Sequence, residues 1–166
     1  MPSSSARYHD DVELLVAIQH GKAIFHMSAS FQVSETGYEH QFERPTDVTP
    51  PDELEDFRTR WAPYAEQLGD WYSRPLPIDV RYADWTPGER GGALPPRHRV
   101  WAKANGRLPD DPILHACVVT YLSDMTLLDT TLLPHPGTFM NQRVQMASLD
   151  HAMWFHRPFR ADEWLL

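Results

Sequence analysis

One helix signal constrains the fold of this chain more than any other feature. Asp110 or Asp111 can cap the start of a helix over residues 111–132, and Pro112 suits the first helical position. Apolar residues from 113 to 128 occur almost all round this predicted helix, a pattern typical of a helix buried on every side. We therefore expect a long central helix that other elements enclose.

Segments with strand-like alternation lie on both sides of this helix in the sequence. Residues 12–33 predict a β-hairpin, with a glycine turn at His20-Gly21-Lys22. Further alternating segments predict strands at 78–83, 97–104 and 144–157, and the last residues, 163–166, resemble the start of one more. The helix is thus expected to have several strands available to cover it.

Residues 34–77 have a different composition from the segments around them. They are rich in carboxylates and contain six prolines, which disfavour continuous helix or strand. One short helix is predicted after Pro50 and Pro51, through Phe57 and Trp61. We interpret this stretch as a linker between two structural units, ordered only in places.

The composition excludes several classes of partner. Hydrophobic residues make up 42% of the chain and the net charge is −8, so a concentrated basic face for nucleic acid or an anionic membrane is not expected. No apolar run approaches the length of a membrane span, and the first five residues lack the pattern of a secretory signal. A cytoplasmic protein is the simplest interpretation.

Cysteine and histidine positions give no support for a disulfide or a metal site. Cys117 is the only cysteine, so no intrachain disulfide can form, and its place inside the predicted helix favours a core residue over a nucleophile. The histidines fall on separate elements or on opposite faces of one strand. Their spacing therefore does not predict zinc binding, and no cofactor is expected.

Asp124 is the residue in the predicted helix that an apolar environment tolerates least. It lies between Leu122 and Leu127, where a carboxylate is costly unless it is paired or functional. Helical spacing places it on a strip of small and polar residues formed with Ala116, Thr120 and Ser123. Such a strip suits a catalytic wall or substrate channel. The alternative is an aspartate that bonds a backbone group or faces solvent.

Ser148 is the corresponding candidate in the predicted strand 144–157. Residues two apart share a face of a strand, so Ser148 and Asp150 are expected to point one way, and His151 and Arg157 the other. A serine in a strand is common and carries little weight alone. The chain contains no Gly-x-Ser-x-Gly motif, so a serine-nucleophile hydrolase is not predicted.

Four segments resemble the type II acyl-CoA thioesterase family. The most specific one runs from Ala147-Ser148-Leu149-Asp150-His151 through Trp154-Phe155-His156-Arg157-Pro158-Phe159. The others are Tyr121-Leu122-Ser123-Asp124-Met125, Val100-Trp101-Ala102-Lys103-Ala104-Asn105-Gly106 and Ala17-Ile18-Gln19-His20-Gly21-Lys22-Ala23-Ile24-Phe25. They follow the family's order over nearly the whole chain, with 34–77 as a divergent linker.

This resemblance implies a fold and a reaction. The fold is of the α+β class, a double hot-dog in which each of two repeats wraps an antiparallel sheet round a long helix. The reaction is hydrolysis of acyl-CoA to free acid and coenzyme A, by a water that an aspartate, a serine or threonine, and a glutamine activate. Asp124 matches the aspartate and Ser148 the hydroxyl residue. A buried carboxylate with a raised pKa would suit general-base catalysis near neutral pH.

The resemblance also indicates what this chain lacks. The family's glutamine would lie beyond residue 166, and the opening strands and helix of the first repeat would precede residue 12. We therefore expect a middle portion of a longer protein. Its parts would be a hairpin of repeat one (1–33), a linker (34–77) and a partial repeat two (78–166). If the hairpin packed in place of the missing strands, Gln32 would approach Asp124 and Ser148.

The sequence also offers basic residues that could bind a ligand and sheet edges that could bind another copy of the chain. Arg97, Arg99 and Lys103 share one side of the strand 97–104 and could contact coenzyme A phosphates, although a solvated charged face is an equal alternative. Open sheet edges favour a homo-oligomer. The leading hypothesis is an acyl-CoA thioesterase, and the second is a non-catalytic acyl-CoA-binding or assembly fragment.

Overall fold

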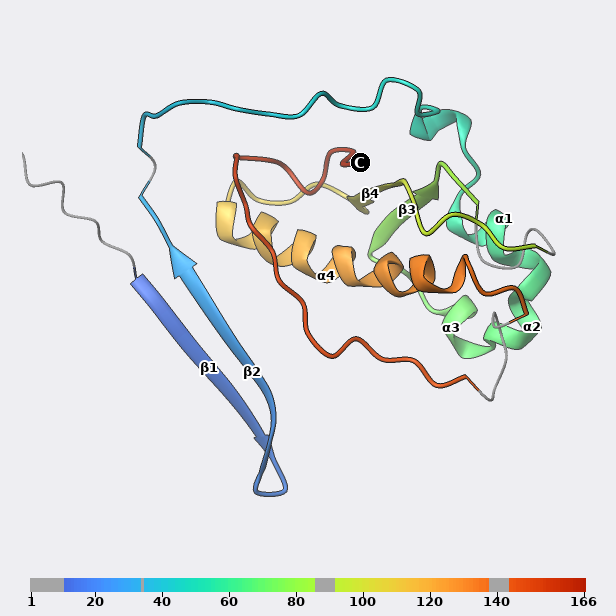
Figure 1. Cartoon of the computed structure of the whole chain (residues 1–166), viewed down its shortest axis with the longest axis horizontal. Helices are drawn as coiled ribbons and strands as arrows, with labels where there is room; N and C mark the ends of the chain where they lie inside the picture. The colour runs from blue at the N-terminus through green and yellow to red at the C-terminus, as the bar shows by residue number, and fades with distance from the viewer. Residues whose placement is uncertain (1–10, 34, 86–91, 138–143) are drawn as a thin grey trace, which may run out of the picture. The chain divides into compact units, whose positions relative to one another are not determined.

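The computed structural model describes residues 11–33, 35–85, 92–137 and 144–166. The chain divides into two compact units, residues 1–44 and residues 45–166. Antiparallel strands and helices are both present, as expected of the α+β class. Figure 1 shows these elements with their labels.

The first unit contains the predicted hairpin. Strand β1 (Asp11–Gln19) pairs antiparallel with β2 (Lys22–Phe31). Both turn residues have positive φ, 50° at His20 and 75° at Gly21, which is the mirror-image turn that matches the twist of paired strands. The hairpin prediction is confirmed, and β2 ends at Phe31, one residue before Gln32.

The second unit is built on a small sheet and one long helix. Strand β3 (Ile78–Tyr82) pairs antiparallel with β4 (Val100–Ala104). Helix α4 (Pro112–Leu132) follows, and Asp111 caps it by accepting from the backbone N–H groups of Ile113 and Leu114. The strand at 78–83 and the helix at 111–132 are thus confirmed, while β4 is shorter than the predicted 97–104.

The stretch between the two predicted repeats has more helix than one short element. It contains the 3-10 turns η1 (Pro51–Glu53) and η2 (Ala62–Tyr64) and the helices α1 (Phe57–Trp61), α2 (Ala65–Leu68) and α3 (Asp70–Ser73). Phe57 and Trp61 are buried against the inward residues of β3 and β4. Aromatic residues at helical spacing therefore give this stretch part of the core of the second unit.

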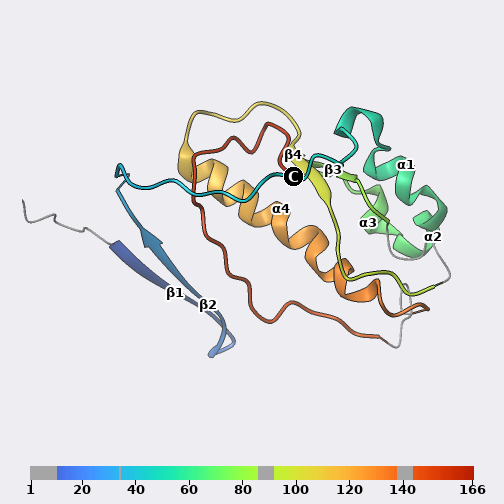
Figure 2. The ribbon, with the colours of Figure 1, turned by 45° about the horizontal axis from the view of Figure 1, so that its top comes forward.

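The predicted strand at 144–157 is wrong. In the structure these residues form no strand and run alongside α4 (Figure 1 and Figure 2). A strand requires a neighbouring strand to satisfy its backbone groups, and among the described residues no strand pairs with this segment. Only Leu165, near the chain end, makes a bridge to Ala102 of β4, with N···O distances of 2.9 and 3.0 Å.

The burial predicted for α4 is only partly correct. Val118, Leu122 and Met125 pack on the core, but Tyr121 and Leu127 on other faces are each 55% exposed. In the second unit the helix has a two-stranded sheet against one side, which leaves the opposite side open among the described residues. Cys117 is consequently exposed, and its assignment to the core is wrong. No described helix combines the length and hydropathy needed to cross a bilayer.

Candidate functional site

The structure brings the side chains of Asp124 and Ser148 together. Asp124 lies in the middle of α4, and Ser148 lies on the segment that runs beside the helix. The Ser148 hydroxyl donates a hydrogen bond of 3.1 Å to Oδ1 of Asp124. A carboxylate held by a hydroxyl has a fixed orientation without a second charge beside it. Such an arrangement can serve a group that accepts a proton from water.

The exposure of this carboxylate differs from the prediction. The Asp124 side chain is 55% exposed, whereas a buried carboxylate was expected. The open side of α4 explains the difference, since Asp124 lies away from the core face formed by Val118, Leu122 and Met125.

His151 also reaches this site, although the sequence predicted the opposite. Its Nδ1 lies 3.7 Å from Oδ1 of Asp124, and its Nε2 lies 3.2 Å from Oγ of Ser123. Strand alternation would have separated Ser148 from a residue three positions later. Because the segment is not a strand, both side chains face α4. Spacing in the sequence could not have identified His151, because a segment without regular structure has no fixed side-chain period.

The polar strip predicted on α4 is largely satisfied by the helix itself. Thr120 Oγ1 donates to the carbonyl of Ala116 at 2.8 Å, and Ser123 Oγ donates to the carbonyl of Thr120 at 2.9 Å. Such bonds to the preceding turn are common for hydroxyls inside helices. Asp124 and Ser123 are the members of the strip that also contact the segment 144–157, through Ser148 and His151 respectively.

Gln32 lies in the first compact unit, whereas Asp124 and Ser148 lie in the second. It is exposed and follows the end of β2. Its approach to the other two residues stays a prediction.

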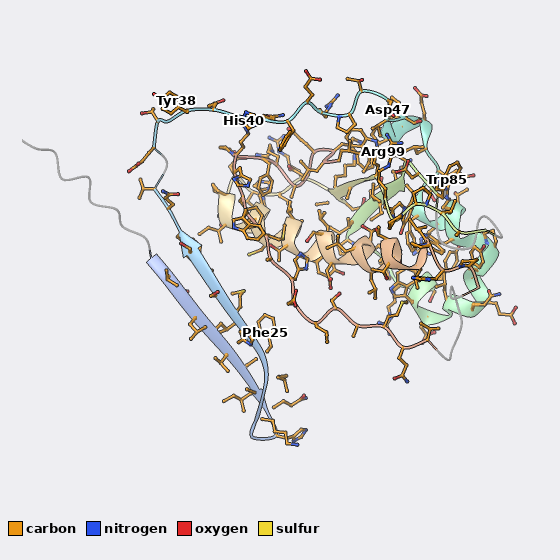
Figure 3. The ribbon with its side chains drawn as sticks, in the orientation of Figure 1. Phe25, Tyr38, His40, Asp47, Trp85 and Arg99 are labelled. Carbon is orange, nitrogen blue, oxygen red and sulfur yellow. The ribbon has the colours of Figure 1, made fainter. Side chains whose placement is uncertain are left out.

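The predicted coenzyme A contacts have partners within the chain. Arg99 donates to both carboxylate oxygens of Asp84, the shortest bond being 2.7 Å, and lies 3.2 Å from a carboxylate oxygen of Asp47 (Figure 3). The Asp84 hydrogen bonds raise the pKa of Arg99 further. The Lys103 ammonium lies 4.5 Å from the centre of the Trp164 ring, a cation–π distance. Arg97 is exposed.

Lys103 also lines a cleft of about 390 Å³. Its other walls carry Arg107, Arg160, Asp162 and Glu163, so basic and acidic groups are mixed there. Arg160 is already paired with Asp162 at 2.9 Å. Lys103, one of the three residues predicted to contact coenzyme A, therefore lies beside a hollow that could admit a ligand.

A second carboxylate of α4, Asp129, was not singled out from the sequence. Burial raises its pKa to about 6, and a hydrogen bond with Tyr82 of β3 partly opposes that rise. Burial likewise raises the pKa of Tyr82. The signal was available, because Asp129 lies inside the predicted helix 111–132, directly after its apolar run. Its position against the sheet indicates a structural role.

His115 joins α4 to the end of the chain. It is 3% exposed, and its Nδ1 accepts the backbone N–H of Ala161 at 3.0 Å. The carbonyl of Ala161 accepts in turn from the N–H of Ala104 on β4 at 2.6 Å. His115 is thus part of the packing, and no group of described residues has the composition to hold a metal ion.

Comparison with known proteins assigns the chain to a family. The family model described as acyl-CoA thioesterase matches residues 74–166, which include α4, Asp124 and Ser148. The chain belongs to the acyl-CoA thioesterase family. The resemblance noted in the sequence is confirmed.

Individual relatives support the same assignment. Acyl-coenzyme A thioesterase 8 of Rattus norvegicus is 38% identical over 93% of this chain and 51% of its own length. Acyl-CoA thioesterase 2 of Haemophilus influenzae is 36% identical over 90% of this chain and 54% of its own. The crystal structure of acyl-CoA thioesterase II TesB2 from Mycobacterium marinum matches with a TM-score of 0.66 and 37% identity, over 92% of this chain and 52% of that one. The chain spans about half the length of these family members.

Proposed function

We propose that this chain hydrolyses acyl-CoA thioesters to free fatty acid and coenzyme A, with Asp124 and Ser148 at the site. The observation that carries the proposal is the 3.1 Å hydrogen bond between them in a chain of this family. It joins a helix residue and a segment residue that are 24 positions apart.

The proposed reaction uses Asp124 as the base. Its carboxylate takes a proton from a water molecule while the water oxygen bonds to the thioester carbonyl carbon. The tetrahedral intermediate then collapses, the carbon–sulfur bond breaks, and the coenzyme A thiolate recovers the proton from Asp124. Ser148 keeps the carboxylate oriented through both steps. Gln32 would add an amide that holds the water without charge.

The remaining features of the proposal concern fold and setting. We propose a partial double hot-dog arrangement with the hairpin 1–33, the linker 34–77 and a second repeat from 78. We also propose a cytoplasmic homo-oligomer. Exposed apolar side chains on the hairpin support association between copies of the chain: Leu14 is 72% exposed and Phe25 is 52% exposed. Apolar side chains on an isolated two-stranded hairpin gain stability from a covering partner.

A second candidate function is acyl-CoA binding without turnover. The exposure of Asp124 favours it, because thioester hydrolysis generally takes place in a site that excludes bulk water. In that case the chain would bind coenzyme A, with Lys103 beside the cleft as one contact, and would release no thiol.

Thiol release from acyl-CoAs of several chain lengths distinguishes the two functions. We expect release by the unmodified chain and a loss of about a hundredfold or more in Asp124→Asn. Asp150→Asn is the matched control, because Asp150 is also an exposed aspartate and lies near Ser148 on the same segment. Equal rates in Asp124→Asn and the unmodified chain would refute the base. Absence of release together with retained binding would favour the second function.

A further inference from the structure

The hydrogen bonds around Ser123 determine which nitrogen of His151 carries a proton. The Ser123 hydroxyl has one hydrogen, and two acceptors on the protein lie within its reach, the carbonyl of Thr120 at 2.9 Å and the sulfur of Met153 at 3.4 Å. Its oxygen, 3.2 Å from Nε2 of His151, is then an acceptor for an Nε2–H group. In the neutral imidazole, Nδ1 is left with a lone pair. That lone pair lies on the side of Asp124.

The distance between His151 and Asp124 fits a shared water better than a direct bond. Nδ1 and Oδ1 are 3.7 Å apart, beyond the range of a hydrogen bond. At such a separation a water molecule can donate one hydrogen to each of the two acceptors. The His151 side chain is 25% exposed and that of Asp124 is 55% exposed, so solvent can enter between them.

We propose that His151 is a catalytic residue, whose Nδ1 accepts one hydrogen of the attacking water while Asp124 accepts the other. The inference rests on the proposed hydrolysis and adds a group to its site. The water's proton passes to Asp124 as its oxygen bonds to the thioester carbon, and Asp124 returns the proton to the departing thiolate. The other hydrogen stays on the new carboxyl group and is lost to solvent with the product. His151 fixes the direction of the water's free lone pair and undergoes no net change.

Two substitutions at His151 separate this function from simple anchoring. The amide oxygen in His151→Asn can occupy the place of Nδ1 and still accept from the water. The amide in His151→Gln can occupy the place of Nε2 and still donate to Ser123. We expect kcat to fall about a hundredfold in His151→Gln, with KM little changed. In His151→Asn we expect the decrease in kcat to be at most about tenfold. Equal activity in both variants, or higher activity in His151→Gln, would overturn the proposal.

Nitrogen NMR of the full chain gives a readout that does not depend on turnover. Long-range proton–nitrogen correlations at about pH 8 report which ring nitrogen is protonated. We expect the Nε2–H form for His151, and a change of its Nδ1 signal in Asp124→Asn but not in Asp150→Asn. An Nδ1–H form would overturn the proposal. If the unmodified chain releases no thiol, the proposed hydrolysis fails, and the NMR result alone decides whether His151 and Asp124 face a common water.

Discussion

Asp129 should reduce the stability of the second unit at neutral pH. Burial raises the pKa of its carboxyl from 3.8 to about 6 in the folded chain. Between these values the folded state holds a proton that the unfolded state has released, so the stability contributed by this group falls as pH rises from about 4 to about 6. The resulting loss of folding free energy is about 3 kcal/mol, and it is fully present above about pH 6.

Asp129→Asn should remove this pH-dependent penalty. The asparagine oxygen can still accept from the Tyr82 hydroxyl, and its amide does not ionise. We expect the free energy of unfolding of Asp129→Asn to exceed that of the unmodified chain by up to about 3 kcal/mol at pH 7.5 and to approach it near pH 4. The difference between the two proteins isolates Asp129, because other carboxylates titrate equally in both.

Urea unfolding followed by tryptophan fluorescence measures this difference. All six tryptophans lie after residue 45, so the signal reports on the second unit. Asp124→Asn is the matched control, since it changes an exposed aspartate of the same helix and leaves Asp129 in place. A stability gain in Asp129→Asn that is equal at pH 4, 6 and 7.5 would refute burial as the origin of the raised pKa.

Three further predictions concern single contacts. His115→Ala should lower the free energy of unfolding by about 2–4 kcal/mol in urea melts, because it opens a cavity and leaves the N–H of Ala161 without its acceptor; an unchanged midpoint would contradict this packing role. Asp84→Asn should cost about 1–3 kcal/mol at pH 7, since it removes the charge facing Arg99. Arg99 holds the pKa of Asp84 below its usual value, so Asp84 becomes protonated in the folded chain only as pH falls well below about 4. Protonation weakens the ion pair in the unmodified chain, and the stability difference between the two proteins should therefore shrink over this range. A difference independent of pH would argue against the ion pair. Cys117 should react with a thiol reagent in the folded chain at one equivalent per chain, and a thiol-release assay therefore requires Cys117→Ser, whose native protein should show no reaction.

Local signals in the sequence were sufficient to predict the elements whose conformation depends on neighbouring residues in the chain. The hairpin has alternating strands and a glycine turn, and α4 has an aspartate cap and a proline in its first turn. The segment 144–157 also alternates, but its conformation depends on whether a neighbouring strand is present. Sequence alternation carries no information about that neighbour, so the prediction there was wrong.

The same error determined which site residues could be predicted. Asp124 and Ser148 were identified from the helix strip and the family motif, and the structure joins them by a hydrogen bond. The period of two of a strand predicts that His151 lies on the opposite face from Ser148. A non-repetitive backbone has no fixed period, and its side-chain directions follow from the contacts it makes with α4.

Asp124 and Asp129 show how one apolar helix can hold two carboxylates with different consequences. Five residues correspond to about 140° of rotation on a helix, so the two side chains leave α4 in different directions. Asp129 faces β3, where burial raises its pKa and Tyr82 satisfies it. Asp124 faces the open side, where Ser148 bonds it and His151 lies beyond direct contact. A group that must exchange protons with water and substrate requires such access, whereas we expect the half-buried Asp129 to affect stability alone. If Asp129→Asn left thiol release intact while Asp124→Asn abolished it, this division of roles along α4 would hold, and the reverse result would contradict it.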